Sequence, residues 1–291
     1  EIARFICDEN ELIDSFYCRK HKKIAKLQRI CKTCNTVSKT EICNICNNKT
    51  SIADFVDIDI KEVFEGALEL LDIKKYMLPK TIKGVKGLVS KNKIPEPIEK
   101  VILRAMQDIF VFKDGTCRFD ATDVPITHFY PKEIFCNVEK LRKLGYNAYL
   151  DIYGEGKEQK KIEQFIVNHE LYENQLVELF HQDIIVNRKG AEYLLKITKF
   201  IDNLLLKYYK LDKFYNAKII NDLIGHFVIT LSPHTSCGIL GRIIGFSDAN
   251  VGFAHPYLIS ARRRNADGDE DSILLLLDGL LNFSRSYLPS S

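Results

Sequence analysis

Apolar residues recur at the spacing of an α-helix in several parts of the chain. One helix is expected to begin near residue 60, and another over 97–106, where Pro97 suits the first turn. A further helix is expected over 131–144, because Gly145 follows it in the position of a C-cap. The longest is expected over 189–210, with one apolar face made by Leu194, Ile197, Ile201, Leu204 and Tyr208.

Runs of β-prone residues lie between these helices. Two of them, 109–113 and 116–119, are joined by Asp114-Gly115, which is the strongest local signal for a β-hairpin in the sequence. A hairpin over 109–119 is therefore expected. The polar, charged stretch 154–161 is the best candidate for a linker.

Strands are expected again over 226–231 and 239–246. Gly241 and Gly245 interrupt the second run, and glycines inside strand-like runs indicate bulges, tight bends or close backbone approach, as in a small barrel. These patterns predict an α+β fold. Its expected parts are a zinc-binding module over 1–50, an α+β region over 51–153, a linker and long helix over 154–215, and a barrel segment over 216–291.

The composition indicates a folded protein and leaves its partners open. Hydrophobic residues make up 46% of the 291 positions, charged residues make up 28%, and the formal net charge is +3. There is enough apolar material for a core, and only local clustering of charge would indicate nucleic acid. No apolar run approaches the roughly 20 residues of a membrane span, and no signal-peptide pattern opens the chain. Because the chain begins with Glu1, we expect it to be a piece of a longer polypeptide.

Nine cysteines, six of them before residue 50, indicate a reduced intracellular protein with a metal-binding front end. Cys31, Cys34, Cys43 and Cys46 form two CxxC pairs joined by a short loop. Such pairs deliver four thiolates to one tetrahedral Zn²⁺. The alternative is two pairs of idle or disulfide-bonded cysteines.

A weaker set of zinc ligands lies upstream. Cys7, Cys18 and His21 include one knuckle-like pair, but Asn10 stands where a further ligand after Cys7 is expected. A second zinc site is therefore a hypothesis, and both sites would be structural, since nothing reactive lies between the ligands. The basic residues over 19–32 form either a solvated face or a rim that rests on phosphates.

The densest charge cluster is RRRNADGDED, over 262–271. Asp267 and Asp269 lie at i and i+2, so they point the same way along an extended backbone, and Gly268 between them permits a sharp bend. Carboxylate oxygens at this density suit Mg²⁺ or Ca²⁺ rather than Zn²⁺. The sequence therefore predicts a divalent-metal site in this loop.

Other interpretations of the loop compete with this one. An EF-hand counted from Asp267 would need glycine where Ser272 stands, and the apolar run 273–277 looks like a buried helix rather than half of a calcium loop. A solvated turn neutralised by its own arginines is a second alternative. Carboxylates, a bridging metal and guanidinium groups together would instead bind phosphate.

The same loop carries a resemblance to a known family. NADGDED (265–271), followed by LLLLDGLLNFSRSYLP (274–289), resembles the catalytic region of the large subunit of the archaeal family D DNA polymerase. Other stretches resemble that subunit in the same order. They are IKGVKGLVS (82–90), KIPEPIEKVILRA (93–105), VFKDGTCRFDATDVPITHF (111–129), NAKIINDLIGHFVITLSPHTSCGILGRIIGF (216–246) and the cysteine-rich front.

The resemblance implies a two-barrel architecture with double-psi β-barrels, of which this segment should lack part of one. It implies Asp267 and Asp269 as ligands of a two-metal Mg²⁺ site, and Asn265 as a residue that orients the loop. Asp271 fits the aspartate spacing of the similar RNA polymerase loop. Phosphate or DNA contacts are expected from Arg242, His255, Arg262, Arg263 and Arg264.

The resemblance further implies Mg²⁺-dependent nucleotidyl transfer from a dNTP to a primer 3′-hydroxyl, in the cytoplasm and near the nucleoid. Implied partners are primer-template DNA, a small exonuclease subunit and a sliding clamp, with no membrane, and the segment alone is expected to be inactive. A non-catalytic, zinc-containing nucleic-acid-binding module is the main alternative. An enzyme like RNA polymerase is another.

Overall fold

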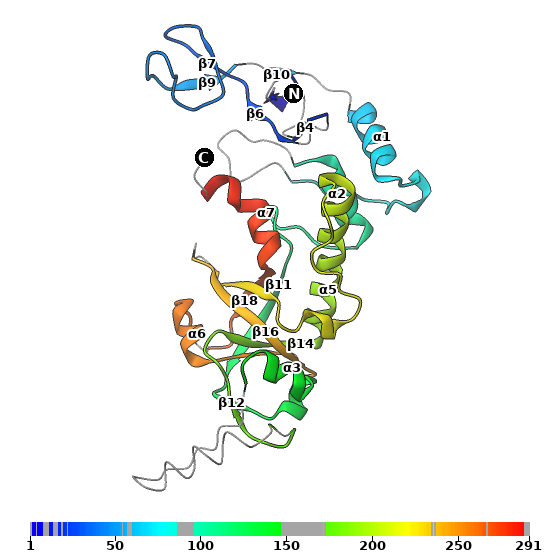
Figure 1. The fold of residues 1–291 in the computed structure, drawn as a ribbon, viewed down its shortest axis with the longest axis vertical. Coiled ribbons are helices and arrows are strands. Elements are labelled where there is room, and N and C mark those ends of the chain that lie inside the picture. The colour runs from blue at the N-terminus through cyan, green and yellow to red at the C-terminus, as the bar shows by residue number, and fades with distance from the viewer. Residues whose placement is uncertain are drawn as a thin grey trace. The chain divides into compact units, whose positions relative to one another are not determined.

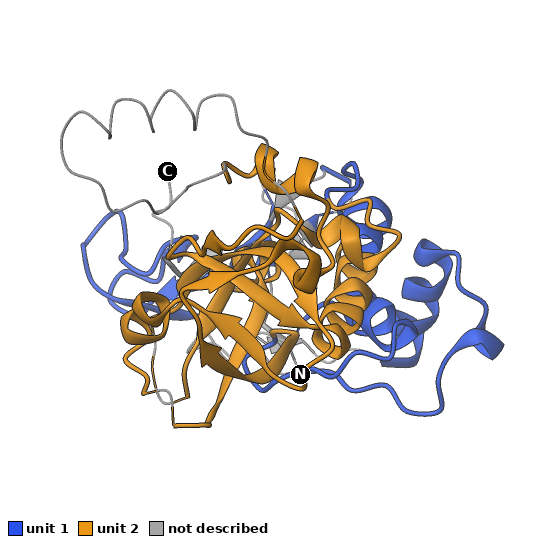
Figure 2. Ribbon diagram, turned by 90° about the horizontal axis from the view of Figure 1, so that it is seen from below, with its two compact units in different colours: residues 1–115, 202–214, 285–291 blue, residues 116–201, 215–284 orange. Residues whose placement is uncertain are grey.

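The structure, a computed structural model, describes the chain in two compact units. It describes all residues except 1, 4, 8–11, 14–16, 19, 22, 54, 57–59, 86–95, 147–170, 172, 234, 236, 266 and 288–291. Unit 1 comprises 1–115, 202–214 and 285–291, and unit 2 comprises 116–201 and 215–284 (Figure 2). The linker expected over 154–161 lies outside the described residues.

Unit 2 is built on a closed barrel of six strands (Figure 1). Around the barrel the order is β11-β17-β14-β16-β15-β18, and β18 closes it by pairing with β11. The β11–β17 and β14–β16 pairs are parallel, and the others are antiparallel. The strands are β11 (Arg118–Pro125), β14 (Asp183–Asn187), β15 (Phe227–Leu231), β16 (Ile239–Ser247), β17 (Gly252–Ala254) and β18 (Glu270–Leu275).

The closed barrel corrects one expectation, that this segment would lack part of it. The expected strands over 226–231 and 239–246 are confirmed as β15 and β16. A Cβ at Gly245 would lie 2.6 Å from the carbonyl oxygen of Ile134, so this glycine permits a close backbone approach. All five residues of β14 are buried, as suits a strand with a parallel neighbour inside a fold.

A hydrophobic cluster connects two barrel strands, β14 and β16, to shorter elements outside the barrel. It joins Ile185 and Ile244 of the barrel to residues such as Phe129, Leu141 and Tyr146. The elements that supply it are β12 (His128–Phe129), the 3₁₀-helix η2 (Pro131–Ile134), α3 (Val138–Lys143) and β13 (Val177–Glu178). These short elements pack around residues 179–182, which connect β13 to β14.

Two sequence predictions in this region are wrong. The expected hairpin over 109–119 does not form, because 118–119 begin β11, which pairs with β17 and β18 instead. The expected helix over 131–144 is broken by Phe135, whose φ of 50° is left-handed, so that only α3 is α-helical. Its end is as expected: Gly145 has φ 102°, and the Tyr146 N–H donates to the carbonyl of Leu141.

Elsewhere three helical predictions are confirmed and one is wrong. The run 273–277, expected to be a buried helix, contains the end of strand β18 (Glu270–Leu275), and helix α7 begins only at Leu276. In unit 1, α1 (Ile60–Leu71) and α2 (Ile98–Met106) pack on each other and on the π-helix η3 (Leu204–Tyr209). The predicted long helix is α5 (Arg188–Asn203) continued by η3, which ends at the left-handed Lys210. The other helices in the described part of the chain are η1 (Lys75–Met77), η4 (Ile220–Leu223), α6 (Pro256–Ala261) and α7 (Leu276–Tyr287).

The described residues among the first 56 form short strands. One described hydrophobic cluster of this part consists of Phe5, Ala25 and Leu27, with Ile52 packed against it. The strands are β1 (Ile2–Ala3), β2 (Phe5–Ile6), β3 (Leu12–Ile13), β4 (Tyr17–Cys18), β5 (Lys23–Ile24), β6 (Lys26–Leu27), β7 (Arg29–Cys31), β8 (Val37–Ser38), β9 (Thr50–Ile52) and β10 (Phe55–Val56).

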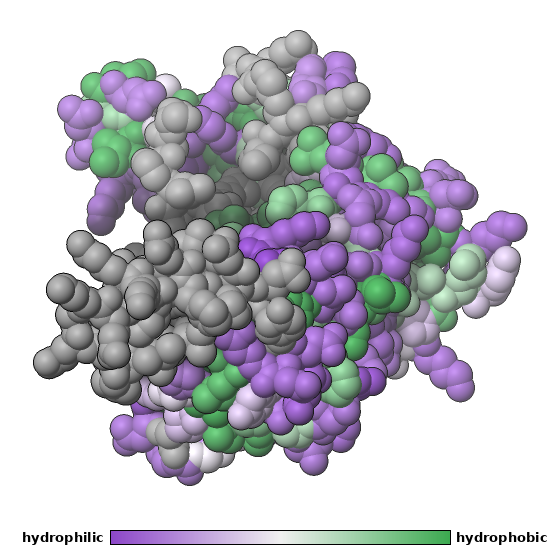
Figure 3. All heavy atoms as spheres, turned by 60° about the horizontal axis from the view of Figure 1, so that its bottom comes forward, coloured by the Kyte–Doolittle hydropathy of each residue, from purple (hydrophilic) through white to green (hydrophobic). Residues whose placement is uncertain are grey.

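Hydrophilic side chains predominate on the face of the molecule shown in Figure 3, and apolar residues form small patches among them. Among the described residues, the helices include none that is long and apolar enough to span a bilayer.

Candidate active site

The acidic loop, residues 262–271, joins the end of α6 to the start of β18. At the end of α6 the N–H groups of Arg263 and Arg264 donate to the carbonyls of Ser260 and Ile259. This is a Schellman motif, whose left-handed position is usually glycine; here Arg263 occupies it with φ 58°. The helix end therefore sets the direction in which the loop leaves.

The other end of the loop is fixed by β11. Thr122 pairs with Glu270 in the antiparallel β11–β18 register, and its Oγ1 donates to the carbonyl of Gly268 at 3.1 Å. Gly268 has φ 93°, and a Cβ there would meet nothing within 4 Å. The position thus needs glycine for its backbone conformation and not for space.

Asp267 and Asp269 flank this bend, and both are exposed. Asp269 forms an ion pair with Arg264, whereas Asp267 has no ion pair within the described part of the chain. Two solvent-facing carboxylates separated by one residue offer only hard oxygen atoms, which is the donor set that Mg²⁺ takes in proteins. The predicted metal ligands are therefore open to solvent.

Asp271 differs from the other two aspartates. Its side chain is only 3% exposed, with Oδ2 3.1 Å from Nη1 of Arg262 and Oδ1 3.7 Å from Nε of Arg264. The carboxylates of Asp267, Asp269 and Asp271 do not come within 4.8 Å of one another as a group, although all three are described. Asp271 is thus an internal ion-pair partner, and the expected catalytic role for it is not supported.

The arginines that precede the loop occupy three different environments. Arg262 is fully buried, with Nη1 2.7 Å from Oδ2 of Asp123 on β11, so its guanidinium faces the interior in this structure. Arg264 is half-buried between Asp269 and Asp271. Arg263 is exposed and makes no ion pair among the described residues, so it alone of the three presents a guanidinium to solvent.

Sequence reasoning missed Asp123. Burial raises the pKa of its carboxyl, and the charge of Arg262 beside it acts in the opposite direction. A signal was present: an acidic residue stands inside the strand-like run RFDATDVP, where a buried carboxylate needs a cation. The identity of that cation could not be read, because it lies 139 positions along the chain.

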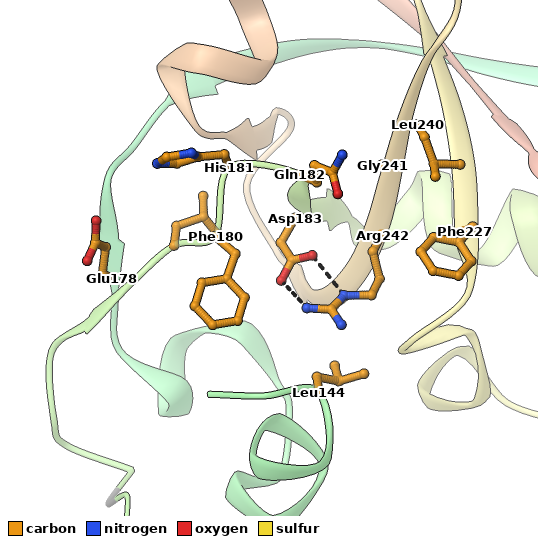
Figure 4. Close-up of a pocket in the computed structure, with 11 residues that line it drawn as sticks. Leu144, Glu178, Phe180, His181, Gln182, Asp183, Phe227, Leu240, Gly241 and Arg242 are labelled. Atoms are coloured by element: carbon orange, nitrogen blue, oxygen red, sulfur yellow. Dashed lines mark hydrogen bonds and ion pairs between the residues drawn. The ribbon is translucent and has the colours of Figure 1, made fainter. Parts of the chain in front are cut away.

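Arg242 lies in a cavity of about 780 Å³ on the barrel (Figure 4). Its Nε and Nη2 donate to Oδ1 and Oδ2 of Asp183 at 2.8 and 2.7 Å, and this bonding raises its pKa. The hydroxyl of Tyr146 also donates to Asp183, at 2.6 Å. Because the charge of Arg242 is neutralised within the fold, the expected phosphate contact is not supported.

His255 forms the N-cap of α6. Its Nδ1 accepts the N–H of Tyr257 at 3.2 Å, and its ring lies 4.3 Å from that of His181. Burial, followed by the nearby His181, lowers its pKa. The structure thus gives His255 a capping role. Asn265, the remaining predicted residue of the site, is exposed.

The four cysteines of the predicted zinc site come together. The Sγ atoms of Cys31 and Cys46 are 3.3 Å apart, and that of Cys34 lies 3.5 Å from Cys43 and 3.7 Å from Cys46. Tetrahedral Zn²⁺ with Zn–S bonds of about 2.3 Å needs sulfur atoms about 3.8 Å apart, so the set fits the ion.

The backbone explains the convergence of the thiols. Asn35 and Asn47 follow the two CxxC pairs in left-handed conformations, and their N–H groups donate to the carbonyls of Cys31 and Cys43 at 2.8 and 3.0 Å. These turns aim N–H groups at the sulfur atoms. The hydrogen bond from the backbone of Cys34 is the largest of the effects that lower the pKa of Cys31 to about 6. A thiolate, the form that binds metal, is thereby favoured.

The upstream ligands also converge. One ligand atom each from Cys7, Cys18 and His21 lies within 4.8 Å of the others, and the Sγ of Cys18 is 3.3 Å from Nδ1 of His21. These are three of the four donors that a closed zinc site takes. Asn10 lies outside the described residues.

Comparison with known proteins gives a consistent result. The family described as "DNA polymerase II large subunit DP2, catalytic domain" matches residues 74–291, a range that includes the barrel and the acidic loop. Several curated proteins named DNA polymerase II large subunit are similar. The protein from Archaeoglobus fulgidus is 57% identical over 232 residues, that from Pyrococcus furiosus 55% over 228, and that from Methanococcus maripaludis (strain C5) 52% over 234.

The alignments with these three proteins cover 80%, 78% and 80% of this chain, and 19%, 17% and 19% of the respective relatives. The chain therefore spans about a fifth of the length of the curated relatives that it matches.

Proposed function

The chain belongs to the family of DNA polymerase II large subunit catalytic domains, and from this premise we propose that its acidic loop supplies the metal-binding carboxylates of a DNA-directed DNA polymerase. The observation that carries the proposal is the exposed pair Asp267 and Asp269, held on either side of the bend at Gly268 on the barrel. The pair fits Mg²⁺ in its donor atoms and its exposure.

Bound Mg²⁺ would lower the pKa of the primer 3′-hydroxyl and offset the charge of the triphosphate. The chain's own residues prepare the site for this chemistry. Asp267 and Asp269 present oxygen ligands at the solvent side of the loop. Arg264 holds Asp269 in place through an ion pair, and Arg263 offers a free-standing guanidinium to a phosphate of DNA or nucleotide.

We extend the proposal to the architecture. The closed six-stranded barrel with two parallel strand pairs, β11–β17 and β14–β16, supports a barrel of the double-psi type. In the polymerase such a barrel would act with a second one. Primer-template DNA and dNTPs are the proposed substrates, and a small exonuclease subunit and a sliding clamp the proposed partners.

The two cysteine-containing groups are proposed as structural zinc sites. The sulfur separations of the Cys31 group and the convergence of Cys7, Cys18 and His21 support this role. Exposed lysines of this part, such as Lys26, Lys32 and Lys49, favour a second function for it, which is contact with the phosphates of DNA.

The test replaces Asp267 or Asp269 by alanine in the full-length polymerase and measures primer extension and DNA binding separately. We expect extension to fall by about 10³-fold or more, as when the developing charge of a transition state loses its stabilisation, while DNA binding persists. Asp248→Ala is the matched control, because Asp248 is an exposed aspartate of the same unit that pairs with Arg188.

The alternatives give different results in the same assay. Extension by the Asp267 variant at the rate of the unaltered enzyme would contradict the proposal and leave a non-catalytic nucleic-acid-binding module. Incorporation of ribonucleotides in preference to deoxyribonucleotides would instead indicate an enzyme like RNA polymerase.

A further inference from the structure

One buried cation holds two buried carboxylates at the base of the acidic loop. Arg262 is the C-cap of α6, and Asp271 is the second residue of β18, so the 3.1 Å ion pair between them joins the two ends of the loop. Asp123 of β11 lies 2.7 Å from the same Nη1 atom. The three side chains are 0%, 3% and 4% exposed, in that order. We name these three residues the clasp.

Charge explains why the clasp stays closed. Burial is the largest cause of the raised pKa of Asp123, and the negative charge of Asp271 adds to it, so two ionised carboxylates at this place need a cation beside them. Within the described residues, none of the three guanidinium nitrogens of Arg262 makes a hydrogen bond of good geometry. Attraction between opposite charges at short range therefore holds the clasp.

The ion pairs continue outward from the clasp to the exposed part of the loop. Arg264 lies between Asp271, at 3.7 Å, and Asp269, with which it forms a close pair. Negative and positive groups thus alternate from the barrel strand to a carboxylate at the surface. The hydrogen bond from Thr122 to the carbonyl of Gly268 fixes the tip of the loop to the same strand.

From these contacts we propose that the clasp of Asp123, Arg262 and Asp271 positions Asp267 and Asp269 for metal binding, although none of the three touches the metal. This inference rests on the proposed function of the loop. A clasp made for stability alone would be better built from apolar side chains, because burying three charged groups costs desolvation that their attraction barely offsets. The ion pairs of the clasp instead fix the geometry of the acidic loop.

The test measures Mn²⁺ binding to the full-length polymerase by electron paramagnetic resonance, without DNA or nucleotide. The variants are Asp271→Asn and Arg262→Met, which open the clasp, and Arg262→Lys, which keeps its charge. We expect the first two to weaken Mn²⁺ binding by about 10- to 100-fold, the usual loss of metal affinity when a residue that orients the metal ligands is replaced. Arg262→Lys should keep most of the Mn²⁺ affinity of the unaltered protein. Asp248→Asn makes the same chemical change in the exposed Asp248–Arg188 pair and should leave binding unaltered.

The outcome also separates a positioning role from a merely structural one. If the single variants fail to fold, the triple variant D123N/R262M/D271N serves instead, because it removes all three charges together and keeps side chains of similar size. We expect this variant to fold but to bind Mn²⁺ more weakly than the unaltered protein. Folded clasp variants that bind Mn²⁺ as tightly as the unaltered protein would overturn the inference. If Asp267→Ala also binds Mn²⁺ normally, the proposed metal site itself is wrong; if only that variant loses binding, the clasp alone is wrong.

Discussion

The hydroxyl of Tyr146 donates a 2.6 Å hydrogen bond to Oδ2 of Asp183, the same oxygen that Nη2 of Arg242 contacts at 2.7 Å. Asp183 is the first residue of β14 and is almost completely buried, so its charge depends on these two donors. Burial, followed by the charge of Asp183, raises the pKa of Tyr146, which keeps the hydroxyl protonated as a donor.

Tyr146→Phe should therefore destabilise the protein without affecting the proposed chemistry. The variant loses the hydrogen bond to the buried charge of Asp183 and the one that the hydroxyl accepts from the Phe180 N–H. The first loss alone is expected to lower the free energy of unfolding by about 1.5–3 kcal/mol. Urea unfolding measures this change, and Tyr130→Phe removes a hydroxyl from a more exposed tyrosine as a control. A loss of primer extension larger than the loss of folded protein would show that the Arg242 cavity takes part in function.

His255 predicts a dependence of stability on pH. Its pKa is lowered in the folded state, first by burial and then by His181, while Glu178 opposes the shift and His128 adds to it. Below about pH 6.5, the ordinary pKa of histidine, the unfolded chain takes up a proton that the folded chain resists. The neutral ring therefore contributes its full stabilisation above about pH 6.5. This contribution is lost as the pH falls from there through the lowered pKa of His255 in the folded state.

The variant His255→Asn tests this reasoning, because asparagine caps helices well and does not titrate. We expect thermal unfolding of the variant to depend less on pH between about 6.5 and 5 than that of the unaltered protein. Protonation of His255 would remove the Nδ1 acceptor for the Tyr257 N–H, which asparagine retains as a carbonyl. An identical pH dependence in the two proteins would mean that other groups govern acid unfolding.

The zinc prediction concerns the front of the chain. Cys34→Ala should abolish one bound Zn²⁺ per chain and unfold the β7–β9 region, because the proposed metal would tie the two CxxC pairs of that region together. Elemental analysis measures the zinc content, and limited proteolysis measures the unfolding. Cys237→Ala, at an exposed cysteine outside both groups, is the control. Full zinc content in the Cys34 variant would contradict the site.

The sequence predicts those features of the site that depend on neighbouring residues. The spacing of Cys31, Cys34, Cys43 and Cys46 contains the whole four-cysteine cluster, and Asp267 and Asp269 are adjacent to the glycine that bends between them. The helix α5 is likewise predictable, because its apolar face repeats every turn.

Features that depend on strands distant in the chain could not be predicted. The expected hairpin failed because β11 finds better partners in β18 and β17, more than 120 residues away. The same pairing brings Asp123 to Arg262 and Thr122 to Gly268, and no local pattern indicates either contact. The acidic loop is thus recognisable from its own residues, whereas the residues that hold it are visible only in the fold.

Arg263 provides a prediction in which stability and function move in opposite directions. It occupies the left-handed position at the end of α6, with φ 58°, a conformation that costs a residue other than glycine about 1 kcal/mol. Arg263→Gly should therefore raise the free energy of unfolding by up to about that amount. If the exposed guanidinium binds phosphate, the same variant should raise the KM for the nucleotide or weaken DNA binding, and salt should weaken DNA binding less steeply than in the unaltered protein.

Lys210→Gly is the matched control, since Lys210 is an exposed basic residue with the same φ of 58° at the end of η3, far along the chain from the loop. It should gain the same stability without loss of nucleotide or DNA affinity. If both variants gain stability and neither loses affinity for nucleotide or DNA, Arg263 does not bind phosphate.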